Sequence, residues 1–260
     1  MPPIITLLTD FGTSDTYVAQ MKGVILGISP DATIIDITHD VQPQAIEQGA
    51  FLLESAYRYF PSGTVHVAVV DPGVGTERRA LAVRTNRWMF VAPDNGLLTS
   101  VLRNEEQFEA YEITNSRFML PQISSTFHGR DIFSPAAAYL SLGTPVSELG
   151  PQVFDPVMLP PPPVPSDNTF EGRIIHIDRF GNCITDIEES RFRNWLGSRT
   201  AVITVSGQLI HGPIRTYAEA APGGLSALFG SSGRLEIAIN MGNAAVELGL
   251  MLGSKVLVRV

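Results

Sequence analysis

The amino-acid sequence predicts two folded parts: an α/β N-terminal domain with a mostly parallel sheet flanked by helices, and a smaller all-β, barrel-like C-terminal domain. In the first half, apolar runs of strand length alternate with segments of helical spacing, which is typical of a parallel sheet covered on both faces. In the last third, short strand-like runs are separated by Gly, Asn and Ser turns, as in small barrels and sandwiches. We therefore expect domains at 1–155 and 169–260, joined by a proline-rich linker at 156–168.

The alternation in the first half gives its elements in order. Val18, Met21 and Ile25, for example, recur at the spacing of one helix face. The expected strands are 4–9, 33–38, 65–70, 80–84, 88–92 and 108–113. The expected helices are 16–28, 43–60, 97–102 and 132–142, the last with Asp131 as the candidate N-terminal cap.

The pattern of the second part begins after four consecutive prolines, Pro160 to Pro163. Such a segment is stiff and extended, and it cannot lie inside a sheet because proline lacks the N–H donor. The expected strands after it are 170–177, 200–205, 208–211, 225–229, 234–239 and 255–260.

Composition excludes several classes of protein. A content of 44% hydrophobic and 17% charged residues is too apolar for a disordered chain. The net charge of −8 argues against nucleic acid as a partner, because phosphate binding needs a basic face. A single cysteine, Cys183, excludes a disulfide framework and a cysteine-cluster metal site. No apolar run approaches the ~20 residues of a membrane span, and the N-terminus lacks a basic signal-peptide region, so we expect a cytoplasmic protein that does not bind a membrane.

Polar residues gather where the expected strands end. Asp10 follows the first strand, His39 and Asp40 follow the second, and the loop 71–79 follows the third. A further polar loop lies at 124–131. Because ligands bind outside the carboxyl ends of strands in open parallel sheets, these loops are the candidate site.

Each candidate has a structural interpretation beside the functional one. Asp10 is either a ligand-binding carboxylate or a helix cap. The 71–79 loop lacks the Gly-Lys-Ser/Thr ending of a Walker loop and the third glycine of GxGxxG, so it is not a phosphate-binding loop of either kind. It brings Asp71 near Arg78 and Arg79, and these residues form either part of a ligand site or a structural ion pair. His128 is either a group that handles protons near neutral pH or a loop histidine bonded to the backbone.

Two turns of the second part carry further candidates. The turn 178–182 combines Asp178, Phe180 and Asn182, which can bind a base or an amino acid or can form an ordinary Asx turn. The turn 230–233 (Gly-Ser-Ser-Gly) offers hydroxyls and amides to a carboxylate, or is a plain β-turn.

Six segments of the sequence, taken together, carry a resemblance over nearly the whole chain. They are Leu-Thr-Asp-Phe-Gly at 8–12, Tyr-Val-Ala-Gln-Met-Lys-Gly at 17–23, Val-Asp-Pro-Gly-Val-Gly-Thr at 70–76, Ala-Pro-Asp-Asn-Gly-Leu-Leu at 92–98, Phe-His-Gly-Arg-Asp at 127–131 and Asp-Arg-Phe-Gly-Asn at 178–182. In this order they resemble the S-adenosyl-L-methionine (SAM) hydroxide adenosyltransferases, relatives of the SAM-dependent fluorinase and chlorinase. The resemblance implies hydrolysis of SAM to adenosine and L-methionine. It also implies a homotrimer with SAM between the N-terminal domain of one subunit and the C-terminal domain of its neighbour.

The resemblance also implies roles for residues. Asp71, Arg78 and His128 match the family's water-handling trio; the choice of Arg78 over Arg79 comes from the alignment. Asp10 matches the ribose-binding carboxylate. The remaining substrate-binding candidates are Phe180 and Tyr217 around adenine, Asp178, Asn182 and Ser231 around the methionine groups, and Asn95 in the segment 92–98. The sulfonium is a good leaving group, so the reaction needs an oriented water at ribose C5′ and, with SAM as the substrate, no cofactor or metal.

Two alternatives remain, a SAM-dependent halogenase and a non-catalytic SAM or adenosine sensor. The halogenases carry tyrosine in place of Asp71, and a carboxylate there repels a halide. The fluorinase carries serine in place of Gly129 and has an inserted loop that is missing between Arg84 and Trp88. The complete trio argues against the sensor.

Overall fold

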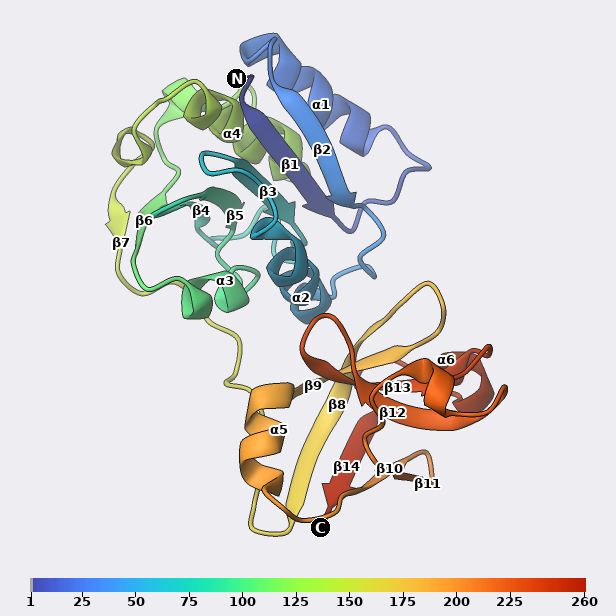
Figure 1. Cartoon of the computed structure of the whole chain (residues 1–260). Helices are drawn as coiled ribbons and strands as arrows, with labels where there is room; N and C mark the ends of the chain where they lie inside the picture. Colours follow the sequence, from blue (N-terminus) through green and yellow to red (C-terminus); the bar gives the residue numbers. More distant parts are fainter. Residues whose placement is uncertain (1) are drawn as a thin grey trace. The chain divides into compact units, whose positions relative to one another are not determined.

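The computed structural model describes residues 2–260 (Figure 1). The chain divides into two compact units, of which the first ends at Leu159 and the second begins at Pro160. Each unit has its own sheet and its own hydrophobic core.

The first unit is an α/β domain built on a mixed sheet with the strand order β2-β1-β3-β5-β4-β6-β7. The strands are β1 (Ile4–Thr9), β2 (Thr33–Thr38), β3 (Val65–Val69), β4 (Ala80–Thr85), β5 (Met89–Pro93), β6 (Phe108–Glu112) and β7 (Gln152–Val153). The helices are α1 (Tyr17–Ile28), α2 (Ile46–Tyr57), α3 (Thr99–Asn104) and α4 (Ser134–Ser141). Strands β2, β1, β3 and β5 pair in parallel, whereas β4, β6 and β7 join antiparallel. The predicted α/β domain with a helix-flanked sheet is confirmed.

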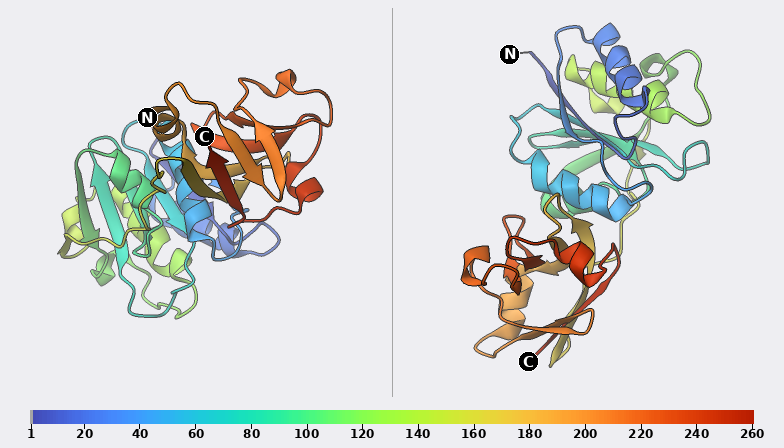
Figure 2. Two further views of the ribbon diagram at one scale, coloured as in Figure 1. Left: turned by 90° about the horizontal axis from the view of Figure 1, so that it is seen from below. Right: turned by 90° about the vertical axis from the view of Figure 1, so that its right-hand side faces the viewer.

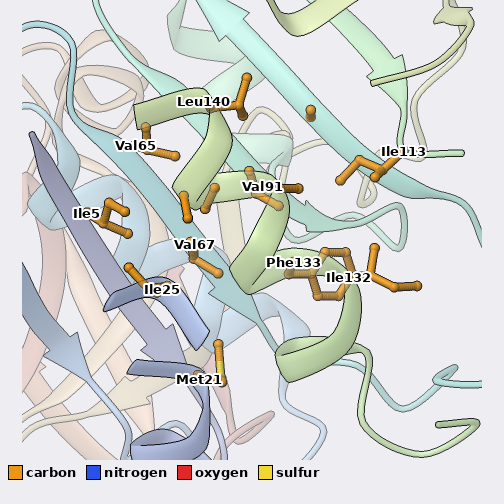
Figure 3. Packing of buried hydrophobic residues seen from close by; sticks show 14 of the residues in the cluster. Ile5, Met21, Ile25, Val65, Val67, Val91, Ile113, Ile132, Phe133 and Leu140 are labelled. Atoms are coloured by element: carbon orange, nitrogen blue, oxygen red, sulfur yellow. The ribbon is translucent and has the colours of Figure 1, made fainter. Parts of the chain in front are cut away.

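Both faces of this sheet are buried, as its continuous apolar strands predict. Ile5 and Val67 belong to the core that includes Met21 and Ile25 of α1, together with residues of α4 (Figure 3). The alternate strand residues, such as Leu8, pack on the α2 side. Figure 2 shows α1 and α4 on one face of the sheet and α2 on the other. This arrangement directs the carboxyl ends of β1, β2 and β3, and the loops that follow them, to one edge.

The helix at the end of the first unit begins differently from the prediction. A π-helical turn, Gly129–Phe133, runs directly into α4. Asp131 lies inside this turn, where its carboxylate pairs with Arg130 (Nε–Oδ1 2.6 Å) and accepts a hydrogen bond from the Ser124 N–H (2.8 Å). The prediction that Asp131 caps the helix was therefore wrong, because the helical backbone already starts before it.

The second unit is an antiparallel sheet with the order β11-β10-β14-β8-β9-β13-β12. Its edge strands β11 and β12 lie in contact, so the sheet nearly closes into a barrel, and the predicted barrel-like domain is confirmed. The strands are β8 (Thr169–Ile177), β9 (Cys183–Glu188), β10 (Val202–Val205), β11 (Gln208–His211), β12 (Leu225–Phe229), β13 (Arg234–Ile239) and β14 (Lys255–Arg259). Strand β9 and the short helices α5 (Glu189–Leu196) and α6 (Ala244–Leu248) were not predicted.

Part of the proline-rich segment is fixed to the first unit. The Val157 N–H donates to Asp94 Oδ1 (2.7 Å), and the Leu159 N–H donates to Thr99 Oγ1 (2.8 Å). No helix or strand occurs between residues 155 and 166, as the proline content predicts. The segment therefore crosses the first unit as an extended strap before the four consecutive prolines.

Candidate active site

Three side chains predicted to act together meet beyond the carboxyl end of β3. Asp71 follows this strand, Arg78 lies later in the same loop, and His128 immediately precedes the π-helical turn. Arg78 Nε donates to Asp71 Oδ1 (2.9 Å) and Oδ2 (3.0 Å), and its Nη2 also bonds Oδ2. The same Nη2 lies 2.9 Å from His128 Nδ1. Arg78 thus connects the carboxylate to the imidazole.

The environment of the trio determines its charge states. The side chains of Asp71 and Arg78 are only 4% and 10% exposed, and the guanidinium lies 5.2 Å over the Phe133 ring. An arginine can only donate, so His128 Nδ1 is the acceptor and the imidazole proton is on Nε2. Burial, and next the charge of Arg78, lower the pKa of His128, so His128 is neutral at neutral pH with its Nε2–H available as a donor.

Gly75 allows the loop of Asp71 and Arg78 to approach the loop of His128. Its φ is +77°, and a Cβ at this position would lie 2.2 Å from the Ser125 carbonyl oxygen. A side chain is thus excluded both by the backbone conformation and by the contact. The two loops can meet only because residue 75 is glycine.

Asp10 lies at the same edge, at the end of β1. Its Oδ2 accepts a hydrogen bond from the Gln44 N–H (2.8 Å), and Gln44 has a φ of +68°. Burial raises the pKa of Asp10, and the charge of Asp71 raises it further. The two carboxylates are therefore close enough to interact, as the strand-end argument predicts.

His39 supports the loop that carries Asp10. Its Nδ1 lies 2.8 Å from Thr9 Oγ1, and this hydroxyl accepts from the Phe11 N–H (3.2 Å). On the other side of the ring, Nε2 lies 3.0 Å from Asp36 Oδ1. His39 is buried, so it links strand β2 to the turn after β1.

Arg79 and Asn95 have separate partners. Arg79 pairs with Asp94 (2.7 Å) and Asp155 (2.8 Å), which fixes the start of the strap. The Asn95 side chain donates to the Val70 carbonyl (2.8 Å), next to Asp71 in the chain. The structure thus brings Arg78, and not Arg79, to Asp71 and His128, and it engages the Asn95 amide with main chain.

In the second unit, Asp178 organises the turn between β8 and β9. Its Oδ1 accepts from the N–H groups of Phe180 and Asn182 (both 2.9 Å), and its Oδ2 accepts from Asn182 Nδ2 (2.9 Å). This geometry is an Asx turn, and it also presents the Phe180 ring, 75% exposed, to the surroundings. The turn therefore fixes three of the predicted binding residues at one place.

Tyr217 and Ser231 lie on the neighbouring loops of the barrel. The Tyr217 hydroxyl donates to Glu236 Oε2 (2.6 Å), and Ser231 is exposed in the turn between β12 and β13. Burial raises the pKa of Tyr217 and that of Glu236, and the charge of Asp178 contributes to both shifts. Asp178 and Tyr217 hence form one electrostatic cluster with Glu236, a residue that the sequence analysis did not single out.

Within residues 2–260, no helix combines the length and the apolar character needed to cross a bilayer. Over the same residues, no group of three or more His, Cys, Asp or Glu side chains is arranged to hold a metal ion.

Both parts of the chain match models of one protein family. Residues 5–150 match the model of the SAM hydroxide adenosyltransferase N-terminal domain, and residues 172–257 match that of the C-terminal domain. The chain is a member of the SAM hydroxide adenosyltransferase family. The predicted resemblance is therefore confirmed for both domains of this family.

Curated relatives span nearly the whole chain of this SAM hydroxide adenosyltransferase homologue. The (R)-S-adenosyl-L-methionine hydrolase of Thermus thermophilus is 39% identical over 97% of this chain and 98% of its own. The hydrolase of the same name from Salinispora arenicola is 38% identical over 97% and 96%. A fluorinase of Nocardia brasiliensis is 32% identical over 99% and 97%.

Solved structures of the same length support the family fold. A conserved protein of Thermotoga maritima matches with a TM-score of 0.90 and 35% identity, over 98% of this chain and 100% of its own. A conserved protein of Thermus thermophilus matches with a TM-score of 0.76 and 37% identity, over 98% and 99%.

Proposed function

We propose that this member of the SAM hydroxide adenosyltransferase family hydrolyses SAM at ribose C5′, giving adenosine and L-methionine. The observation that carries the proposal is the hydrogen-bonded Asp71–Arg78–His128 cluster beyond the carboxyl end of β3. Family membership and the hydrolases among the relatives support the same reaction.

In the proposed reaction, a water oxygen bonds to C5′ while the C5′–S bond breaks. The sulfur leaves with the electron pair as the neutral thioether of methionine, so no general acid is needed. The water loses one proton, and adenosine keeps the other as its 5′-hydroxyl. Orientation of the water in line with the breaking bond is then a large part of the catalysis. SAM is the substrate in this scheme, and neither a cofactor nor a metal takes part.

The hydrogen bonds of the trio suggest a division of roles. His128 Nδ1 is occupied by Arg78, and its Nε2–H is a donor that can orient an oxygen. Arg78 supplies a positive charge that favours hydroxide over water. Asp71 is the member of the trio left to accept the proton of the water, because a carboxylate keeps lone pairs beyond those that Arg78 uses.

For substrate binding, we propose that Asp10 accepts hydrogen bonds from the ribose hydroxyls. In the second unit, Phe180 and Tyr217 contact adenine, while the methionine groups are bound by Asp178, Asn182 and Ser231. Asn95 serves the binding loop indirectly, through Val70.

We further propose a cytoplasmic homotrimer with SAM between the first unit of one subunit and the second unit of the next. The exposed Phe180 ring and the exposed Ser231 support a second subunit at this surface. Ligand sites bury most of the ligand's surface, so these two residues need a further wall to form a closed site. A lone buried cysteine, Cys183, fits a reducing compartment. The acidic net charge supports the absence of a nucleic-acid partner.

The sulfonium sulfur is a stereocentre, and the relatives' names specify the R form. We propose the same preference here. The test incubates the purified protein with each sulfur epimer and follows adenosine and methionine by chromatography. We expect both products, formed faster from the R epimer. Methylthioadenosine as the product, or intact SAM persisting for days in the bound state, would overturn hydrolysis, and the latter outcome would favour a sensor.

The halogenase alternative is disfavoured by two features of the site. Asp71 places a buried carboxylate where a halide would approach. At Gly129, a Cβ would lie within 3.2–3.3 Å of Phe127, Met21 and Phe11, so the serine found in the fluorinase would be crowded. Incubation with SAM and chloride tests this alternative through the formation of 5′-chloro-5′-deoxyadenosine.

A further inference from the structure

Glu236 is a carboxylate in an unusual place. It lies in the middle of β13, opposite Leu228 of β12 and Ile184 of β9, and it is only 7% exposed. A buried carboxylate destabilises a fold unless its hydrogen bonds are satisfied. The contacts of Glu236 therefore indicate what it does.

Both of its close contacts are with loops that carry proposed substrate-binding residues. Oε2 accepts the hydrogen bond of the Tyr217 hydroxyl at 2.6 Å. Oε1 lies against the main chain of Gly230, where a Cβ would come within 1.6 Å of it. Gly230 directly precedes Ser231, so Glu236 contacts both the loop of Tyr217 and the turn of Ser231.

The Tyr217 ring needs such support because it is 39% exposed and lies on a single 3₁₀ turn, Tyr217–Glu219. A hydrogen bond at the hydroxyl fixes the far end of the ring. Burial raises the pKa of the Tyr217 phenol, as does the bond to Glu236, so the phenol stays protonated and remains the donor. The charge of Asp178 also reaches Glu236, which places the pair beside the third binding loop.

We propose that Glu236 is a positioning residue of the SAM site, which orients the Tyr217 ring for the adenine and shapes the turn that presents Ser231. This assignment rests on the proposed function. Glu236 acts through these two neighbours and does not take part in bond breaking, since the water-handling trio belongs to the first unit.

The test compares Glu236→Ala, Glu236→Gln, Tyr217→Phe and the double variant Glu236→Ala/Tyr217→Phe in the full chain. KM and kcat for SAM are measured, together with adenosine affinity by calorimetry. The matched control is Glu171→Gln on β8, an exposed carboxylate that pairs with Lys255 (2.9 Å). Circular dichroism establishes that each variant is folded.

We expect Glu236→Ala to raise KM for SAM and to weaken adenosine binding about tenfold, the loss expected for one hydrogen bond to a charged group. The value of kcat should stay within about twofold, because uniform binding affects KM alone. Tyr217→Phe should have a similar effect, and the double variant should lose no more than the larger single loss. Glu236→Gln should recover most of the affinity, because its amide oxygen still accepts from the phenol.

Unchanged KM and adenosine affinity in the folded Tyr217→Phe variant, or in a folded Glu236→Ala variant, would overturn the assignment, as would a loss in the double variant equal to the product of both single losses. If Glu236→Ala does not fold, Tyr217→Phe still decides the question, because it removes the same hydrogen bond from the other side. If the proposed function itself is wrong, the wild-type protein forms no adenosine from SAM, which distinguishes this outcome from failure of the Glu236 assignment. Adenosine affinity of the variants then tests the positioning role separately, and wild-type protein that does not bind adenosine overturns both.

Discussion

Arg78 donates hydrogen bonds to both carboxylate oxygens of Asp71, through Nε at 2.9 and 3.0 Å and through Nη2. The pair is almost fully buried. Removing one partner of such a pair leaves an uncompensated charge, which costs more than the pair itself contributes. The geometry also leaves Nη2 in contact with His128, so substitutions of Arg78 affect two neighbours at once.

Replacing Arg78 with lysine should lower kcat for SAM hydrolysis by about 100-fold or more. Lysine keeps the charge, but its single ammonium cannot reproduce the planar set of bonds to Asp71 and His128. Adenosine formation under saturating SAM measures the effect. The control is Arg79→Lys, whose side chain pairs with Asp94 and Asp155 instead and should affect mainly stability. A larger loss of kcat in Arg79→Lys would show that the trio is wrongly assigned.

The pH dependence of hydrolysis should report on His128. Its pKa is lowered, first by burial and then by Arg78, so the neutral form persists below the ordinary histidine value of about 6.5. Protonation would remove the acceptor of the Arg78 bond and place two cations side by side. We therefore expect kcat/KM to stay level through the ordinary histidine pKa and to fall only at a more acidic pH. The His128→Asn variant should have a lower kcat/KM at neutral pH, and its kcat/KM should no longer fall with this titration at acidic pH. An acidic limb unchanged from that of the wild type would contradict the assignment.

The sequence was sufficient for features that depend on local pattern. The predicted strand ends placed Asp10 and Asp71 at one edge of the sheet, together with the loop of His128, because parallel strands direct the loops that follow them to the same side. The alternation of apolar strands and helices located the first domain. The residue pattern alone did not separate Arg78 from Arg79, because adjacent side chains in a loop differ only in direction, and the choice of Arg78 came from the family resemblance.

Other features depend on contacts between distant segments. Strand β9 (Cys183–Glu188) interrupts its apolar residues with Thr185, Asp186 and Glu188, so it lacked a strong strand pattern. Glu236 is an acidic residue within an apolar strand, and its contacts with Tyr217 and Gly230 are visible only in the folded structure. The contact with Tyr217 depends on how the loop after β11 folds back onto β13, which no local motif predicts.

Gly75→Ala should abolish most hydrolysis while leaving the fold of the first unit intact. A Cβ would meet the Ser125 carbonyl at 2.2 Å and would strain a positive φ, so the loop of Asp71 and Arg78 must move away from His128. We expect kcat to fall about 100-fold, since small displacements of catalytic groups have effects of this size. The control is Gly63→Ala, which also has a positive φ but meets no atom within 4 Å. Equal losses in both variants would show that backbone strain alone is responsible.

His39→Ala should raise KM for SAM with a smaller effect on kcat. The imidazole bonds Thr9, which in turn accepts from Phe11, and these residues flank Asp10. Losing this support should loosen the ribose-binding carboxylate and raise KM by about fivefold to tenfold, the range of one buried hydrogen bond. Steady-state kinetics with SAM measures the changes in KM and kcat separately. A fall in kcat with unchanged KM would place His39 in the bond-breaking step instead.

Folding stability should fall below pH 6.5 because of His66. Its ring is buried between Tyr57 and Phe90, with Nδ1 2.7 Å from Thr6 Oγ1, and burial lowers its pKa to about 3. The unfolded chain takes up a proton near pH 6.5 while the folded chain does not, so the free energy of unfolding should fall by ~1.4 kcal/mol per pH unit from this residue between pH 6.5 and 3. Urea titrations between pH 4.5 and 7 measure the slope. His66→Gln should reduce it by that amount, and equal slopes in wild type and His66→Gln would refute the prediction.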